Sequence, residues 1–245
     1  MILLGVNIDH IATLRNARGD FFPSIVYAAS IVEQNGGDFI TIHLREDRRH
    51  IKDDDLFLLV NNVTTYINLE MACNDDILEK ALKAKPKKVT LVPEKREEIT
   101  TEGGLDVKNN FSRIKDFVTE LKKNKIEVSL FIEPDISSID TFLKTGAKDI
   151  EIHTGRYSIS SGIEKEKELK KIKEFTEMVK RETDLRVCAG HGLNYHNVLP
   201  ICNIKGIEEL NIGYSIITYA IFNGLGNAVK KMKDLIMLSR LEKID

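Results

Sequence analysis

Short apolar runs alternate with longer amphipathic segments along the whole chain, and few folds are compatible with this pattern. Short runs rich in β-branched residues are typical of buried strands, whereas apolar residues spaced three or four apart are typical of helices. We expect eight strands, at residues 2–8, 38–43, 66–71, 88–92, 126–132, 148–153, 185–189 and 207–212. We expect helices near residues 23–35, 52–63, 75–84, 109–123, 136–145, 164–183, 194–203 and 215–239.

Eight strand–helix units in 245 residues are what a (β/α)8 barrel requires. A doubly wound parallel sheet is the main alternative, because it also alternates strands with helices. No change of composition along the chain marks a second domain. The sequence therefore predicts an α/β protein, a single-domain (β/α)8 TIM barrel over residues 1–245 with extra helical segments.

The composition argues against several classes of protein. The chain has 36 Lys+Arg and 38 Asp+Glu, so its charge gives no general attraction to nucleic acid or to anionic membranes. No apolar run approaches the roughly 20 residues of a membrane-spanning helix. Three widely spaced cysteines, Cys73, Cys188 and Cys202, form neither a disulfide framework nor a zinc-binding pattern, which indicates a reducing, cytoplasmic location.

Polar residues lie two apart at the carboxyl ends of several expected strands. Side chains at positions i and i+2 of a strand share a face, and the carboxyl ends of barrel strands meet at one mouth, where barrel active sites lie. Charged groups buried there without partners would be costly, so the pattern predicts a catalytic cup. The pairs are Asn7 and Asp9, Thr41 and His43, Asn68 and Glu70, Glu151 and His153, and Asn211 and Gly213.

Histidines are concentrated at the same positions. His10, His43, His153 and His191 fall at or just after strand ends, and His50 lies in the loop after the second strand. One histidine alone is more often structural, but four at one rim favour acid–base chemistry, because imidazole exchanges protons near neutral pH. These histidines and the strand-end carboxylates are also ligand types for zinc or manganese. A metal-dependent hydrolase or isomerase and a non-catalytic binder of sugar phosphates therefore stay open as alternatives.

Glycines and arginines after the strands indicate phosphorylated substrates. Gly190 and Gly192 follow the seventh strand, and Gly213 ends the eighth just before a helix, where backbone N–H groups and the helix N-terminus attract anions. A second basic group follows the first two strands: Arg15, Arg18, Arg45, Arg48 and Arg49. Surface ion pairs explain Arg48 and Arg49 equally well. Two anion-binding regions suit two phosphorylated substrates or one bisphosphate.

Two other features bear on the chemistry. No lysine lies at the carboxyl end of an expected strand, so an amine for imine formation would come from a substrate. The longest irregular segment, residues 93–108, contains Gly103 and Gly104 and follows a strand. It is a candidate lid over the active site, with an ordinary surface loop as the alternative.

Seven motifs, in order between residue 5 and about residue 216, resemble those of the pyridoxine 5'-phosphate synthase family. They are GVNIDHIATLRNARG at 5–19, TIHLREDRRH at 41–50, NLEM at 68–71, LVPEKR at 91–96, TTEGGLD at 100–106, EIHTG at 151–155 and AGHGL at 189–193. The resemblance implies a (β/α)8 enzyme of bacterial vitamin B6 synthesis that uses no cofactor and no metal. It implies condensation of 1-deoxy-D-xylulose 5-phosphate with 3-amino-2-oxopropyl phosphate to pyridoxine 5'-phosphate, phosphate and water. It also implies a homo-oligomer, often an octamer built from dimers.

The resemblance also implies roles for single residues. His43 would be the first general acid/base, Glu70 the second base, His191 a late proton donor and Glu151 a group that stabilises a transition state. Ligands of the aminoketone phosphate would be Asn7, Arg18, Gly192 and Gly213. Contacts to the other substrate, or between the two, would be Asp9, His10, Arg45, His50 and Thr100. The family pattern after the eighth strand is commonly Asn-Ile-Gly-His, whereas this chain has Tyr214 as its candidate binding residue there.

Overall fold

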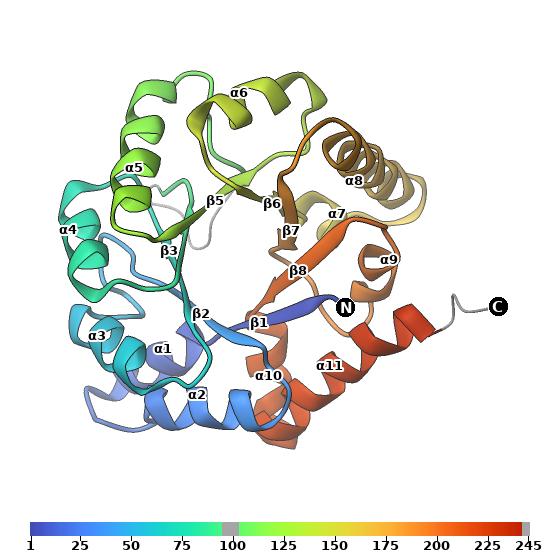
Figure 1. Ribbon diagram of the computed structural model, residues 1–245. Coiled ribbons are helices and arrows are strands. Elements are labelled where there is room, and N and C mark those ends of the chain that lie inside the picture. Colours follow the sequence, from blue (N-terminus) through green and yellow to red (C-terminus); the bar gives the residue numbers. More distant parts are fainter. Residues whose placement is uncertain (95–102, 242–245) are drawn as a thin grey trace.

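The computed structural model describes residues 1–94 and 103–241, and its parallel strands form a closed barrel surrounded by helices (Figure 1). The strands follow one another in chain order, and the last pairs with the first. They are β1 (Leu3–Asn7), β2 (Phe39–His43), β3 (Ile67–Met71), β4 (Lys88–Leu91), β5 (Glu127–Ile132), β6 (Asp149–His153), β7 (Arg186–Gly190) and β8 (Ile207–Ile212). The predicted (β/α)8 fold is confirmed and the doubly wound sheet is wrong, whereas the extent of the domain over residues 1–245 stays a prediction.

The helices cover the outside of the barrel. They are α1 (Asp9–Arg18), α2 (Ile25–Gln34), α3 (Asp53–Asn62), α4 (Asp75–Ala84), α5 (Phe111–Lys123), α6 (Ile139–Thr145), α7 (Gly155–Ile159), α8 (Gly162–Glu182), α9 (Val198–Cys202), α10 (Tyr214–Asn223) and α11 (Leu225–Leu241). A short 3-10 helix, Ile136–Ser138, precedes α6. No helix in the described part of the chain is both long enough and apolar enough to cross a membrane.

Three helical predictions need correction. The helices α1 and α7 were not predicted; each begins within two residues of the end of a strand, where a loop was expected. The helix predicted over residues 215–239 is two helices, α10 and α11, because Gly224 ends α10 with a φ of 79°. A glycine adopts such a positive φ without the steric cost that other residues incur, and glycine commonly follows the end of a helix.

Local sequence explains where the other helices form. Asn74 caps α4 by accepting hydrogen bonds from the N–H groups of Asp76 and Ile77, as expected of an asparagine before a helix. Helix α8 buries an apolar stripe that includes Phe175 and Val179, and its Lys and Glu side chains face solvent. Strand β2 is buried at every position, because barrel strands have packed side chains inside and helices outside.

An ion-pair cluster fills part of the barrel interior toward the amino ends of the strands. The Nζ atom of Lys88 lies 2.7 Å from a carboxylate oxygen of Glu209 and 3.1 Å from one of Asp149. All three side chains are buried. Arg186 also lies 3.2 Å from Asp149, so two cations face the two carboxylates and the cluster balances its charge without any group from the opposite end of the strands.

Candidate active site

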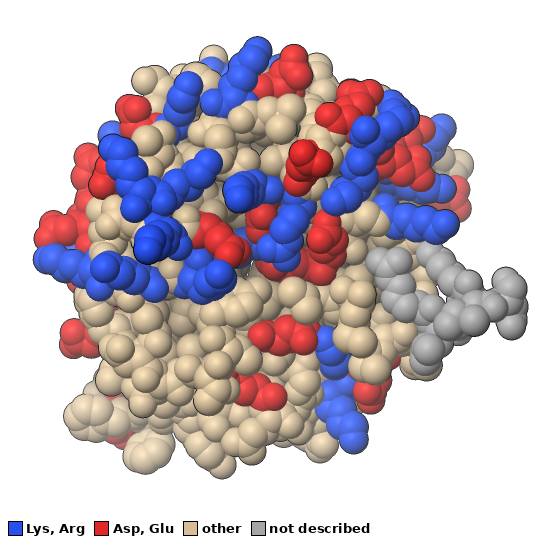
Figure 2. Space-filling model, viewed as in Figure 1, with Lys and Arg blue, Asp and Glu red and all other residues tan. Residues whose placement is uncertain are grey.

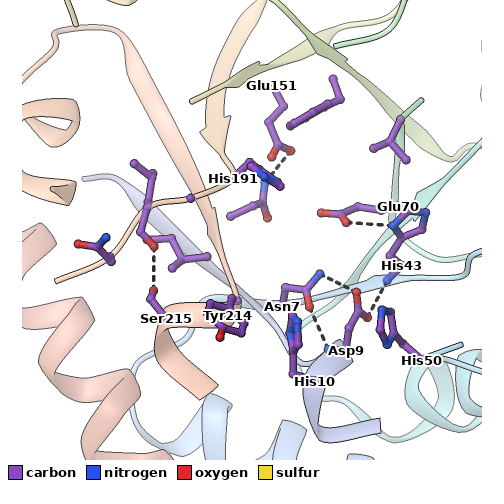
Figure 3. A pocket seen from close by; sticks show the side chains of 18 of the residues that line it. Asn7, Asp9, His10, His43, His50, Glu70, Glu151, His191, Tyr214 and Ser215 are labelled. Atoms are coloured by element: carbon purple, nitrogen blue, oxygen red, sulfur yellow. Dashed lines mark hydrogen bonds and ion pairs between the residues drawn. The ribbon is translucent and has the colours of Figure 1, made fainter. Parts of the chain in front are cut away.

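A cavity of about 650 Å³ opens at the carboxyl ends of the barrel strands (Figure 3). This volume lies in the usual range for pockets that bind small molecules. Twelve of the fourteen predicted site residues line it: Asn7, Asp9, His10, His43, Arg45, His50, Glu70, Glu151, His191, Gly192, Gly213 and Tyr214. The strand-end argument therefore brings nearly all of its candidate residues to one cavity.

The side chains of His43 and Glu70 lie next to each other because β2 and β3 pair in register at these two residues. His43 Nδ1 is 3.9 Å from Glu70 Oε2, and His43 Nε2 is 3.5 Å from Glu94 Oε2 on the other side of the ring. The backbone N–H of His43 donates to Asp9 Oδ1 at 2.9 Å, which Figure 3 shows as a dashed line. The imidazole is thus placed between two carboxyl groups and fixed at its backbone.

The two central carboxyl groups favour their protonated forms. Burial, together with the nearby charges of Glu151 and Asp9, raises the pKa of Glu70 well above its usual value. Burial raises the pKa of Glu151 to about 8, with the charge of Glu209 acting in the same direction. A carboxyl group whose pKa lies near neutrality can both hold and accept a proton, so these groups suit general acid–base catalysis.

A chain of amide and hydroxyl groups fixes Glu151. Asn211 Nδ2 donates to Glu151 Oε2 at 2.9 Å, and Asn211 Oδ1 accepts from Thr41 Oγ1 at 2.7 Å. The orientation of the Asn211 amide is therefore fixed, because both its nitrogen and its oxygen are hydrogen-bonded. The same Nδ2 lies 3.3 Å from Glu209 Oε1, which connects Glu151 to the ion-pair cluster deeper in the barrel.

Two half-buried histidines form another wall of the cavity. The rings of His10 and His50 have centroids 5.8 Å apart, and burial lowers the pKa of both imidazoles. His50 Nδ1 is hydrogen-bonded to Thr13 Oγ1 at 2.6 Å. Tyr214 lies with its ring edge-on to His10, at 5.2 Å between centroids. These side chains present neutral N–H and O–H groups that can donate to a phosphate or hydroxyl of a substrate.

The structure leaves no room for a side chain at Gly192 and Gly213, two of the glycines that are predicted to bind phosphate. A Cβ added at Gly192 would lie 2.1 Å from Ser158 Oγ, and Gly192 has a φ of 76°. A Cβ added at Gly213 would lie 2.8 Å from the Cβ of Asn7. Gly213 also precedes α10, whose N-terminus faces the cavity with Tyr214 and Ser215 in the wall. Backbone N–H groups are accessible here and the helix dipole favours an anion.

The comparison with protein families agrees with this geometry. Residues 4–238 match the family model described as pyridoxal phosphate biosynthesis protein PdxJ. This chain belongs to the PdxJ family.

Relatives of the PdxJ family with the name pyridoxine 5'-phosphate synthase align over nearly the whole chain. The protein of Sulfurihydrogenibium sp. is 54% identical over 242 residues, 98% of this chain and 99% of the relative. The protein of Chlorobium chlorochromatii is 52% identical over 233 residues, 95% of this chain and 99% of the relative. That of Blochmanniella pennsylvanica is 50% identical over 240 residues, 98% of each chain.

Solved structures with low sequence identity share the barrel. A tryptophan synthase structure from M. tuberculosis has a TM-score of 0.65 at 12% identity and covers 96% of this chain and 92% of that chain. The tryptophan synthase subunit alpha of Legionella pneumophila has a TM-score of 0.65 at 11% identity, covering 97% and 93%. At such identities the likeness shows the fold alone.

Two predicted site residues of this PdxJ family member are not in the cavity wall. Arg18 is exposed at the last position of α1 and does not line the cavity, because α1 carries it away from the barrel mouth. Thr100 and most of the candidate lid, residues 95–102, lie outside the described residues. Arg48 and Arg49 form ion pairs of 2.6 Å with Asp53 and Asp47, as the surface-pair alternative expects.

The structure adds residues that the sequence analysis did not select. Glu94 contacts His43, and Glu133 is hydrogen-bonded to His153 at 2.7 Å between Oε1 and Nδ1. Glu133 directly follows β5 and Glu94 lies three residues after β4, so the strand-end rule could have found both. Asn211 was noted in a strand-end pair, but its contact with Glu151 follows only from the barrel register. In the part of the chain that the structure describes, no three His, Cys, Asp or Glu side chains are grouped as a metal site would require.

Proposed function

We propose that this chain is a pyridoxine 5'-phosphate synthase. It joins 3-amino-2-oxopropyl phosphate to 1-deoxy-D-xylulose 5-phosphate, and pyridoxine 5'-phosphate, inorganic phosphate and water are the products. The observation that carries this proposal is the placement of His43 between the carboxyl groups of Glu70 and Glu94 in a cavity with glycine-bordered anion regions. Relatives about half identical in sequence carry the same enzyme name.

The first bond requires a free amine and a polarised ketone. The described cavity wall contains no lysine, so the amine of the aminoketone substrate acts as the nucleophile. Protonated amines do not attack carbonyl carbons, and His43 accepts the proton that the amine must lose. The carbonyl oxygen of the other substrate then leaves as water, with Glu151 in the cavity wall as the donor of a proton.

Ring closure requires removal of a carbon-bound proton and loss of phosphate. Glu70 lies inside the cavity with a raised pKa, so its ionised form is a stronger base than a carboxylate in water. His191 lines the same cavity and supplies a proton to a leaving oxygen late in the sequence. Each well-placed acid or base contributes about 10²–10⁴-fold to the rate.

The two phosphates are assigned to opposite sides of the cavity. Gly192, Gly213 and the N-terminus of α10 bind one phosphate through backbone N–H groups. Arg45, whose guanidinium is buried, and His50 lie on the other side and suit the second. Holding two well-oriented reactants together can lower the barrier by about 7–11 kcal/mol through proximity.

A homo-oligomer in the cytoplasm is part of the proposal. Figure 2 shows that the side of the molecule over α2 and α10 carries few charged side chains, and Phe21, Phe22, Ile221 and Phe222 are strongly exposed. Exposed apolar side chains of this kind favour contact with another copy of the chain. None of the three cysteines forms a disulfide, as expected in a reducing compartment. The near-balance of charges gives no reason to expect a nucleic-acid partner.

One experiment separates the proposal from its two alternatives. Purified protein is incubated with both phosphorylated substrates, with and without a strong chelator, and pyridoxine 5'-phosphate is detected by mass spectrometry. The proposal expects product at equal rates in both samples. Activity that is lost with chelator and restored by zinc or manganese would indicate a metal-dependent enzyme. Calorimetric binding of both phosphates without any product would indicate a non-catalytic binder.

A further inference from the structure

Three side chains at the ends of neighbouring strands form a connected series. Glu133 follows β5, His153 ends β6, and His191 follows β7. His153 Nδ1 is 2.7 Å from Glu133 Oε1, and the rings of His153 and His191 are 5.0 Å apart at an angle of 61°. Of these three, His191 lines the cavity. Glu133 and His153 do not line the described cavity, and His153 reaches it through its contact with His191.

The backbone of His191 is held in an uncommon conformation by the end of β6. His191 has a φ of 76°, in the left-handed region that residues other than glycine rarely adopt. The hydroxyl of Thr154 lies 2.8 Å from the carbonyl oxygen of Gly190 and 2.6 Å from that of His191 and can donate to either. Such a conformation persists only where the surroundings enforce it, and it is common at functional sites.

The His191 ring is enclosed by other rings and by backbone. Phe131 lies edge-on to it at 6.5 Å between centroids, and Phe131 is 5.2 Å from the ring of His153. A Cβ added at Gly155 would lie 2.3 Å from His153 Nε2 and 3.2 Å from His191 Cδ2. Both imidazoles therefore pack against the backbone of Gly155, and a change in the angle of one would displace the other.

Glu133 fixes the ring of His153 in turn. Burial alone would raise the pKa of Glu133, but the hydrogen bond from His153 and the charge of Arg156 hold that pKa below its usual value. Glu133 is therefore ionised at neutral pH and accepts the proton on His153 Nδ1. The backbone N–H of Gly104 also donates to Glu133 Oε1, at 3.2 Å. With Nδ1 bound, His153 turns Nε2 toward Gly155 and His191.

We propose that Glu133 and His153 are positioning residues for His191: Glu133 orients the His153 ring, and that ring holds the His191 imidazole at a fixed angle toward the cavity. This inference rests on the proposed function, in which His191 donates a proton. His191 has its pKa lowered to about 4 by burial and by the neighbouring His153, so at neutral pH the proton that it donates is the N–H of a neutral imidazole. Other titratable side chains on or next to the elements packed around it are Glu133 directly after β5, Glu151 on β6, Arg156 on α7 and Tyr214 on α10.

Four variants test the positioning role through kinetics. His153→Phe keeps the ring that packs on His191 but loses the bond to Glu133, and Glu133→Leu removes the acceptor. Both should lower kcat about tenfold to a hundredfold with KM for each substrate within about threefold, because a misplaced catalytic group costs turnover more than binding. Glu133→Gln keeps an amide oxygen that accepts from Nδ1 and should stay within about threefold of the unmodified kcat. Glu127→Leu, at the other end of β5, removes the exposed ion pair with Lys87 and serves as the matched control.

A second measurement does not depend on activity. Histidine side chains labelled with ¹⁵N are titrated by nuclear magnetic resonance, with His191 assigned from the His191→Gln spectrum and exposed His196 as an internal reference. In His153→Phe the midpoint of the His191 titration should rise from about 4, because the electrostatic influence of His153 that lowers this pKa is removed. If His153→Phe and Glu133→Leu both keep kcat within about threefold and leave the His191 titration unchanged, the inference is wrong. If the unmodified protein makes no pyridoxine 5'-phosphate, the proposed function fails, and the titration still decides whether His153 controls His191.

Discussion

His43 Nδ1 and Glu70 Oε2 lie 3.9 Å apart, at the ends of two adjacent strands whose register pairs these two residues. The separation is longer than a direct hydrogen bond, so the two groups do not bond to each other, and a water molecule or substrate atom beside them can contact both. Burial and neighbouring carboxylates raise the pKa of Glu70. Two proton-exchanging groups are therefore held side by side without a direct bond between them, an arrangement that suits acid–base catalysis.

Glu70→Gln should abolish catalysis while the fold persists. The amide has the shape of the carboxyl group but cannot accept a proton, so kcat should fall by about 10²–10⁴-fold. Tm at pH 7 should not decrease, because the ionised carboxylate is the form that burial disfavours. Steady-state kinetics and thermal unfolding check both parts, with exposed Glu79→Gln as the control. Turnover near that of the unmodified protein would remove Glu70 from its role.

Glu151 should make the stability of the protein depend on pH in a specific direction. Its pKa is about 8 in the folded protein and 4.5 in a free side chain, so the folded state prefers the protonated form. The stabilisation is complete below pH 4.5 and is lost as the pH rises through about 8. Relative to the unmodified protein, Glu151→Gln should therefore gain Tm between these values, by at least the 2–4 °C that correspond to about 1 kcal/mol. Thermal scans across this pH range, with exposed Glu166→Gln as control, measure the difference; a constant Tm difference would contradict the assignment.

Lys88 should be far more important for stability than its neighbour Lys87. Lys88→Met removes the buried cation of Glu209 and Asp149 and leaves them only the partly exposed Arg186, so it should lower the free energy of unfolding by up to about 3–5 kcal/mol. Lys87 is exposed and forms an ion pair with Glu127, so Lys87→Met should cost less than about 1 kcal/mol. Urea unfolding of the two variants gives the comparison. Equal costs would show that the buried cluster contributes no more than a surface pair.

Gly192→Ala should weaken phosphate binding beyond the effect of backbone strain. The new methyl group would lie 2.1 Å from Ser158 Oγ, so this part of the cavity wall must move. We expect KM for a phosphorylated substrate to increase about tenfold, the equivalent of about 1.4 kcal/mol. Gly162→Ala is the matched control, because Gly162 also has a positive φ, 53°, but a Cβ there meets nothing within 4 Å. A similar KM in both variants would count against a phosphate site at Gly192.

Periodicity was sufficient to predict the eight strands but not every helix. The strands bury both faces and therefore appear as apolar runs, and each predicted strand overlaps the observed one. Helix α1 buries only Asp9 and Ala12, so it lacks the apolar stripe that reveals a helix in sequence. Helix α7 has five residues, fewer than periodicity can detect. The break between α10 and α11 depends on the single residue Gly224.

The site was predictable to the extent that it depends on strand ends. His43, Glu70 and Glu151 are found because a barrel brings the ends of its strands to one mouth, wherever they occur in the chain. The contacts made by Glu94 and Glu133 depend on loop conformation, which the local sequence does not determine. Arg18 was predicted from its motif but does not line the cavity. It is the last residue of α1, a helix that the sequence analysis did not predict.

The most direct test of the account follows the nitrogen atom of the product. Unmodified protein is incubated with 1-deoxy-D-xylulose 5-phosphate and ¹⁵N-labelled 3-amino-2-oxopropyl phosphate, and the product is analysed by mass spectrometry together with released phosphate. We expect pyridoxine 5'-phosphate that carries the label in its ring, formed in equal amount with inorganic phosphate. Folded protein that binds both substrates yet forms no pyridoxine 5'-phosphate, or forms it without the label, would contradict the account.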